Sequence, residues 1–144
     1  MLVSIFAGFL GLAVLAQEDG PSDRTVMETC LAEAETGGAV RPDAARCIGT
    51  VAEACMQKSG GGSQAVAACY AREREVWFAD VQALAMGGIY APGQVEWDAY
   101  REAQCRTEAS EHAGGSFEAA ATEVCMNRIT ALRALELRAG AARR

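Results

Sequence analysis

Histidine, lysine and strand-forming patterns are almost absent from this sequence of 144 residues. His112 is the only histidine, and it precedes a pair of glycines that is typical of a solvated turn. No candidate nucleophile is accompanied by a recognisable general base, so catalysis finds no support in the sequence. We therefore expect a protein that is not an enzyme and that uses no cofactor.

Closely spaced metal ligands are also missing. The sequence has six cysteines, and the nearest two, Cys47 and Cys55, are separated by far more than the two residues of a CxxC pair. Zinc sites favour such close pairs. We expect no metal, and in an exported chain an even number of cysteines favours disulfides instead.

The first 16 residues carry no charged side chain and consist mainly of Leu, Val, Ile, Phe, Ala and Gly. This apolar stretch, followed by the polar segment 17–21, predicts a signal peptide over residues 1–16. The usual positive residues at its start are missing, and a membrane anchor is the alternative, but a span needs about 20 apolar residues. We expect a mature form, residues 17–144, that is a single periplasmic or secreted domain without a membrane span.

Acidic residues outnumber basic ones, and the formal net charge is −6 at pH 7. This excess disfavours nucleic acid and anionic lipid as partners. A basic protein is the partner that the charge favours.

Residue types that favour helices, such as Ala, Glu, Arg, Leu and Met, dominate the long segments, and strict apolar–polar alternation does not persist. Glycine-rich breaks separate about five predicted helices. These cover approximately residues 23–36, 43–58, 63–86, 94–112 and 116–138. Val66, Tyr70, Trp77, Val81 and Leu84 follow one stripe of the third, which predicts a core face. Ser116 is the expected N-cap of the fifth.

The glycine turns discriminate among the possible cysteine pairings, because antiparallel helices bring together residues that are equidistant from their shared turn. The midpoints of three consecutive pairs fall beside Gly38, at Gly62 and at Gly115. We therefore predict an all-α fold of antiparallel hairpins with three disulfides, each contributing ~3 kcal/mol. The predicted disulfides are Cys30 with Cys47, Cys55 with Cys69, and Cys105 with Cys125.

A recognisable pattern spans the last two predicted helices. It consists of Trp97, Tyr100, Arg101, Cys105, Gly114, Gly115, Ser116, Cys125, Thr130, Arg133 and Leu137. In order and spacing this pattern resembles the LprI-type lysozyme-inhibitor family, whose domain is a small helical unit of exported bacterial proteins. Upstream the resemblance weakens, because Ala83 and Leu84 stand where the family has Leu-Asn. Gln17 at the cleavage point, rather than Cys, implies a soluble form and not a lipoprotein.

Within this pattern, Trp97, Arg101 and Cys105 follow each other at four-residue intervals and share one helix face. If Cys105 is bridged, Arg101 faces the same interface and needs acceptors, with Asp80 or a carbonyl as candidates and Trp97 or Tyr100 as stacking partners. The alternative is that Trp97 and Arg101 form an exposed recognition patch.

Carboxylates two residues apart do not face each other on a helix. We therefore interpret pairs such as Glu73 with Glu75, and Glu96 with Asp98, as solvated surface.

The segment from Gly87 to Gly93 is either a plain connector or a contact loop. It carries Ile89 and Tyr90, and Glu96 follows it. As a contact loop, its apolar tip would enter a partner's cleft while the acidic flank attracts a basic enzyme.

The leading hypothesis is a periplasmic inhibitor that occludes the substrate cleft of a lysozyme-like muramidase. The alternative is a non-inhibitory interaction module of the cell envelope, such as an immunity or assembly factor on the same scaffold.

Overall fold

The computed structural model describes residues 21–36, 44–86 and 93–142, and every regular element in these ranges is helical. The elements are α1 (Asp23–Thr36), the 3₁₀ helix η1 (Ala44–Cys47), α2 (Thr50–Ser59), α3 (Ser63–Met86), α4 (Gln94–Ser110) and α5 (Glu118–Ala141). The predicted all-α fold of about five helices is confirmed. The predicted signal peptide lies outside the described residues. Among the helices described, none has the length and apolarity needed to cross a membrane.

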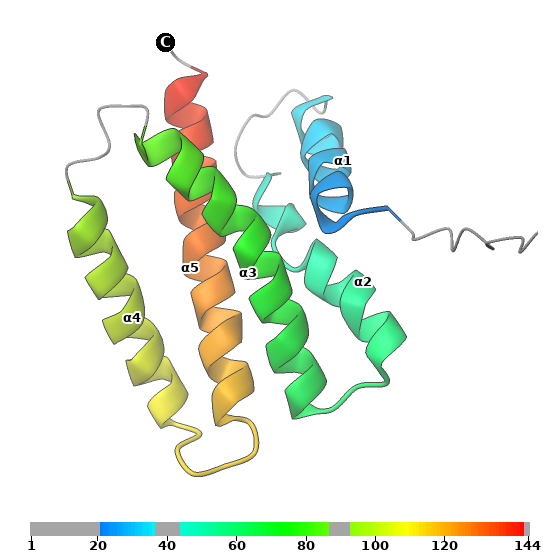
Figure 1. The fold of residues 1–144 in the computed structure, drawn as a ribbon, viewed down its shortest axis with the longest axis vertical. Coiled ribbons are helices and arrows are strands. Elements are labelled where there is room, and N and C mark those ends of the chain that lie inside the picture. Colours follow the sequence, from blue (N-terminus) through cyan, green and yellow to red (C-terminus); the bar gives the residue numbers. More distant parts are fainter. Residues whose placement is uncertain (1–20, 37–43, 87–92, 143–144) are drawn as a thin grey trace, which may run out of the picture.

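The two longest helices, α3 and α5, pack along each other at the centre of the molecule (Figure 1). α4 packs on α5 at one edge of the fold, and α2 packs on α3 at the other. α1 lies over η1 and α2. Consecutive helices α2 and α3 run antiparallel, as do α4 and α5, so these two hairpins agree with the prediction (Figure 1).

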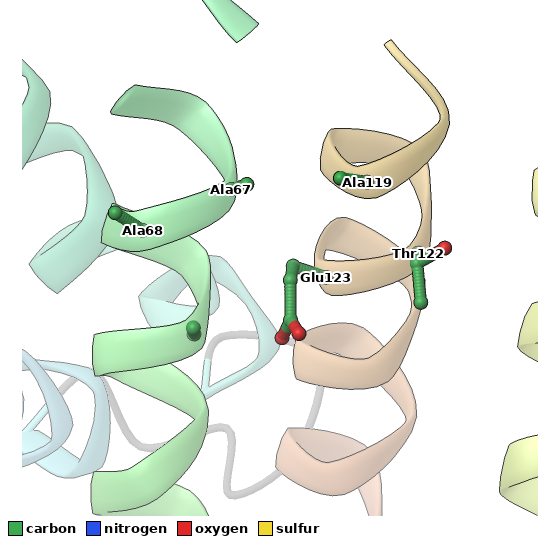
Figure 2. Close-up of a pocket in the computed structure, with 6 residues that line it drawn as sticks. Ala67, Ala68, Ala119, Thr122 and Glu123 are labelled. Atoms are coloured by element: carbon green, nitrogen blue, oxygen red, sulfur yellow. The ribbon is translucent and has the colours of Figure 1, made fainter. Parts of the chain in front are cut away.

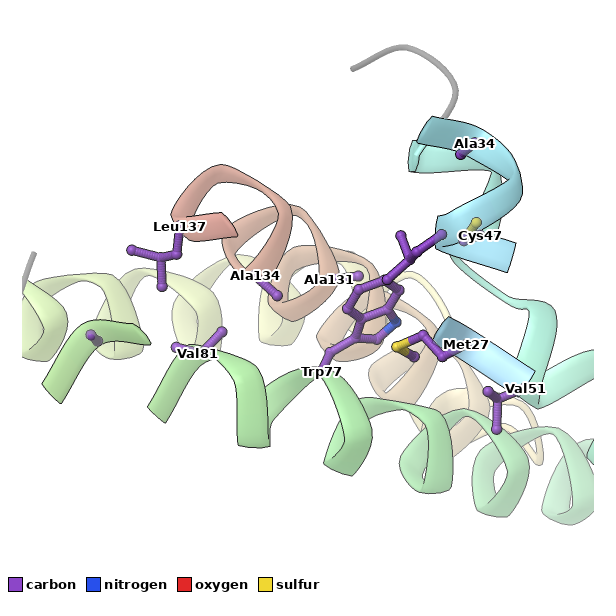
Figure 3. Close-up of a cluster of buried hydrophobic side chains, with 11 residues drawn as sticks. Met27, Ala34, Cys47, Val51, Trp77, Val81, Ala131, Ala134 and Leu137 are labelled. Atoms are coloured by element: carbon purple, nitrogen blue, oxygen red, sulfur yellow. The ribbon is translucent and has the colours of Figure 1, made fainter. Parts of the chain in front are cut away.

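Trp77 of α3 lies at the centre of the main hydrophobic core and is fully buried (Figure 3). Met27 of α1, Val51 of α2 and Ala131 of α5 belong to the same cluster. Small residues such as Ala131 and Ala134 let the backbone of α5 approach α3 closely. The core therefore depends on α1 and α2 as well as on the central helix pair.

The stripe predicted on α3 is partly confirmed. Trp77 and Val81 are buried, whereas Val66, Tyr70 and Leu84 are only partly buried. The stripe is therefore most deeply buried at Trp77 and Val81.

The second predicted helix, residues 43–58, is wrong as a single element. It divides into η1 and α2 because Gly49 has φ of 102°, a left-handed conformation that ends one helix before the other begins. Cys47 and Cys55 consequently lie on different elements. Cys47 can therefore face α1 while Cys55 faces α3, and no single helix has to carry both cysteines.

Three disulfides join the six cysteines in the pairs that the turn midpoints predict. Cα–Cα distances are 5.8 Å for Cys30 and Cys47, and 5.5 Å for Cys55 and Cys69. The third pair, Cys105 and Cys125, has a Cα–Cα distance of 5.4 Å. The bridges connect α1 to η1, α2 to α3, and α4 to α5.

Asp80 joins three helices through ion pairs. Its carboxylate accepts hydrogen bonds from Arg24 of α1 at 2.6 Å and from Nε of Arg138 of α5 at 2.8 Å. Arg138 also pairs with Glu28 at 2.7 Å. Of the two acceptors predicted for Arg101, Asp80 or a carbonyl, Asp80 is wrong, because its carboxylate pairs with Arg24 and Arg138.

Candidate functional site

Arg101 lies inside the contact between α4 and α5 and is only 7% exposed. Its Nη1 donates to Thr130 Oγ1 at 3.3 Å, and its Nη2 is 3.3 Å from an oxygen of Asp98. The guanidinium carbon lies 4.8 Å from the ring centre of Trp97 and 5.3 Å from that of Phe78. These contacts agree with the architectural interpretation of Arg101 and with the predicted stacking on Trp97.

Burial lowers the pKa of Arg101, and the negative charge of Asp98 opposes that effect. The rings of Trp97 and Phe78 and the carboxylate of Asp98 compensate the charge of the buried guanidinium. Arg101 and partly buried Trp97 therefore do not form the exposed recognition patch that was the alternative.

The bridge between Cys105 and Cys125 forms a second, smaller core beside Arg101. Both cysteines are 1% exposed and pack with Ile129, and Trp97 and Met126 cover this cluster. A covalent bond and a buried guanidinium thus hold α4 and α5 in one register. The surface of these two helices is therefore preorganised. A rigid surface loses less conformational entropy on binding a partner than a flexible one does.

The turn between α4 and α5 depends on its two glycines. Gly114 has φ of +73°, and its N–H donates to Glu118 Oε2 at 2.8 Å. A Cβ at Gly115 would lie 3.1 Å from the carbonyl oxygen of His112. Glycine is therefore favoured at Gly114 by its left-handed backbone conformation and at Gly115 by the closeness of this carbonyl.

Ser116 does not cap α5, which begins two residues later at Glu118 without a side-chain cap at its start. α4 correspondingly ends at Ser110, earlier than the predicted end at His112. Successive turn hydrogen bonds, such as Gly115 N–H to the carbonyl of His112 at 2.9 Å, occupy the segment between the helices. The turn is therefore longer than predicted, at the expense of both helices.

Thr130, Arg133 and Leu137 each have a structural place on α5. Thr130 Oγ1 donates to the carbonyl of Met126 at 2.7 Å while it accepts from Arg101. Arg133 pairs with Glu136 at 2.8 Å, and Leu137 is 1% exposed in the main core. These three pattern residues are accounted for by the fold.

Glu96 and Tyr100 remain on the surface of α4. Glu96 is exposed in the first turn of α4, and Tyr100 is 57% exposed. The other two predicted contact residues, Ile89 and Tyr90, lie outside the described residues. Tyr100 is thus the large residue of the pattern that the fold itself leaves outside the core.

Glu73 is a buried residue that the sequence interpretation missed. It is fully buried on α3, so its assignment to solvated surface is wrong, whereas Glu75 is exposed as expected. Glu73 Oε1 accepts from Gly49 N–H at 2.7 Å, and Oε2 accepts from Ala52 N–H at 2.9 Å. The carboxylate thereby caps the start of α2 from a different helix, where the helix dipole also favours negative charge.

The same carboxylate reaches α5 and the central tryptophan. Trp77 Nε1 and Asn127 Nδ2 donate to Glu73 Oε1 at 3.0 Å and 2.9 Å. Glu73 fills the gap in the predicted stripe between Tyr70 and Trp77, and this spacing is the signal that could have identified it. Its role is to position α2 and α5 around α3.

A shallow depression of about 390 Å³ lies between α3 and α5 (Figure 2). Its lining consists of small side chains and one carboxylate, from Ala67, Ala68, Ala71, Ala119, Thr122 and Glu123. Glu96, the predicted contact residue that the structure describes, does not line it. Over the described residues, no three His, Cys, Asp or Glu side chains are grouped to hold a metal ion.

The segment that contains the contact between α4 and α5 is similar to a known protein family. Residues 91–137 match the family model described as Lysozyme inhibitor LprI. The LprI match covers α4, the glycine turn and most of α5, including Arg101, Thr130 and the bridged pair Cys105 and Cys125. The resemblance seen in the last third of the sequence is confirmed. No curated protein and no solved structure gives a significant match to the chain.

Proposed function

We propose that residues 17–144 form an exported, periplasmic or secreted domain that inhibits a lysozyme-like muramidase. The protein acts without chemistry, by covering the substrate cleft of the enzyme. The LprI match over residues 91–137 carries this proposal, since that family is described as lysozyme inhibitors.

Two physical properties support the proposal. The matched helices are held together by a disulfide and by buried Arg101, so their surface is preorganised for a partner. The net charge of −6 attracts a cationic enzyme before any close contact forms.

A non-inhibitory module of the cell envelope, such as an immunity or assembly factor, is the second candidate. The observation that favours it is the extent of the match, because α1, α2 and α3 precede residue 91. These helices supply most of the main core and give the protein surfaces outside the matched region.

Lysis of a cell-wall suspension tests the first candidate against the second. The oxidised protein, purified after export, is added in increasing amounts to lysozymes of several structural classes. Inhibition of at least one class at a stoichiometric concentration supports the proposal. Undiminished lysis by every class at excess protein favours the envelope module.

A further inference from the structure

α4 buries one face and leaves the opposite face open. Arg101 and Cys105 are buried against α5. Positions two residues apart on a helix point about 200° apart, so Ala99 and Ala103 point away from α5. Both alanines are exposed, as expected from this geometry. α4 therefore presents a whole helix face without an intramolecular partner along the described chain.

The two largest exposed apolar side chains of α4 border this open face. Val95 is 78% exposed and Tyr100 is 57% exposed. The side chain of Tyr100 makes no hydrogen bond or ring contact with another residue in the described ranges, although it lies within the LprI match. Exposed tyrosine next to small residues is typical of interface anchors, because a rigid ring buries a large area at low entropic cost.

Most of the net negative charge of the chain falls on α4 and the turn that follows it. Residues 94–118 contain six carboxylates and two arginines, so this segment contributes −4 of the total −6. One of those arginines, Arg101, is buried. Glu96 and Glu102 are exposed on the helix itself. The charge complements a basic partner and steers its approach to α4.

We propose that the outward face of α4, formed by Val95, Glu96, Ala99, Tyr100 and Ala103, docks onto the muramidase. This inference rests on the proposed function and names the contact surface for it. The partner is a basic globular protein, whose cleft accepts the apolar residues while its cations meet the flanking carboxylates.

Ala99→Arg places a large cation at the centre of the outward face of α4. Ala83→Arg is the matched control, because Ala83 is also an exposed alanine within a helix and the change in net charge is identical. Binding of each oxidised variant is measured by surface-immobilised binding to the lysozyme that the wild type inhibits most strongly. Circular dichroism of each variant verifies the fold.

The expected result is a Kd at least about 10-fold higher for Ala99→Arg, with Ala83→Arg within about 2-fold of the wild type. Tyr100→Ala gives a second increase of about 10-fold, mainly through faster dissociation, without adding charge. Equal effects of the two arginine variants, or no effect of Ala99→Arg and Tyr100→Ala, overturn the assignment of α4 while leaving inhibition intact. A wild type that binds no lysozyme at low salt overturns the proposed function itself.

Discussion

Arg101 Nη1 donates a hydrogen bond to Thr130 Oγ1 at 3.3 Å and so joins α4 to α5. The guanidinium that makes this bond also lies over the ring of Trp97 at 4.8 Å. Both residues of the hydrogen bond belong to the segment that matches the inhibitor family. These residues of the sequence pattern therefore have a structural role, which is to hold α4 and α5 together.

Replacing Arg101 with Ala is expected to lower the free energy of unfolding by ~1 to 3 kcal/mol, because buried contacts are lost and Thr130 loses its donor. Arg106→Ala removes an exposed arginine from the same helix and should change stability by less than about 0.5 kcal/mol. Urea denaturation of both variants measures the difference. Unchanged stability of Arg101→Ala together with lost lysozyme binding would assign Arg101 to recognition instead.

Glu73→Gln tests the buried carboxylate that caps α2. Glutamine has nearly the same shape, but its amide group brings hydrogens toward a site that already receives four donors. We expect a loss of ~2 to 4 kcal/mol in the free energy of unfolding. Glu75→Gln, two residues away and exposed, is the control with little expected effect. Similar unfolding midpoints for both variants would show that the network contributes little.

The helices were predictable where local signals and the core agreed, as in α1 and α3. The division of the second helix was not, since Gly49 adopts its left-handed conformation next to a carboxylate 24 residues away. Glu73 was missed for the same reason. The charge of its side chain predicts a position on the surface. Only the tertiary arrangement supplies the four hydrogen-bond donors that allow its burial.

The disulfide pairing is open to direct chemical measurement. Non-reducing peptide mapping of exported protein should recover Cys30 with Cys47, Cys55 with Cys69, and Cys105 with Cys125. Replacing Cys105 and Cys125 together with Ser should cost ~3 kcal/mol, because the unfolded chain regains the entropy of an open loop. A crossed peptide pair or a free thiol would contradict the arrangement of the hairpins.

Acid is expected to weaken the ion pairs that join α1 to α5. The hydrogen bond from Arg138 lowers the pKa of Glu28 below its usual value of 4.5. The folded protein therefore binds this proton more weakly than the unfolded chain, so the contribution is present above about pH 4.5 and is lost as pH falls through the lower folded pKa.

Glu28→Gln should consequently flatten the decline in unfolding free energy between about pH 5 and pH 3. Arg138→Gln should flatten it only in part, because Arg24 also donates to Glu28 and Arg138 also pairs with Asp80. Thermal unfolding across this pH range supplies the comparison. A slope that is the same in wild type and Glu28→Gln would exclude the pair as a source of acid sensitivity.

Binding kinetics separate charge from contact at the start of α4. Glu96→Gln should mainly slow association with a cationic lysozyme, and increasing salt should slow association of the wild type. Glu53→Gln is a matched control, since Glu53 and Glu96 each lie in the first turn of their helix. Tyr90→Ala should mainly speed dissociation if the loop before α4 contributes to the interface. Equal rates for all four proteins would place the contact elsewhere.

The candidate site was only partly predictable from the sequence. Helical spacing correctly placed Arg101 beside Cys105, but Arg101 pairs with Asp98 and Thr130 while Asp80 pairs with Arg24 and Arg138. Spacing along one helix determines which residues share a face. It does not determine which of several cations reaches a carboxylate on another helix.

Inhibition by occlusion of the cleft is tested most directly with a soluble oligosaccharide substrate. Initial rates of the inhibited lysozyme are measured over a range of substrate concentrations at several concentrations of the oxidised protein. Occlusion of the cleft predicts that the apparent KM rises with inhibitor while kcat stays constant, because substrate and inhibitor exclude each other from one cleft. Rates that do not change at any concentration, or a kcat that falls at constant KM, would contradict it.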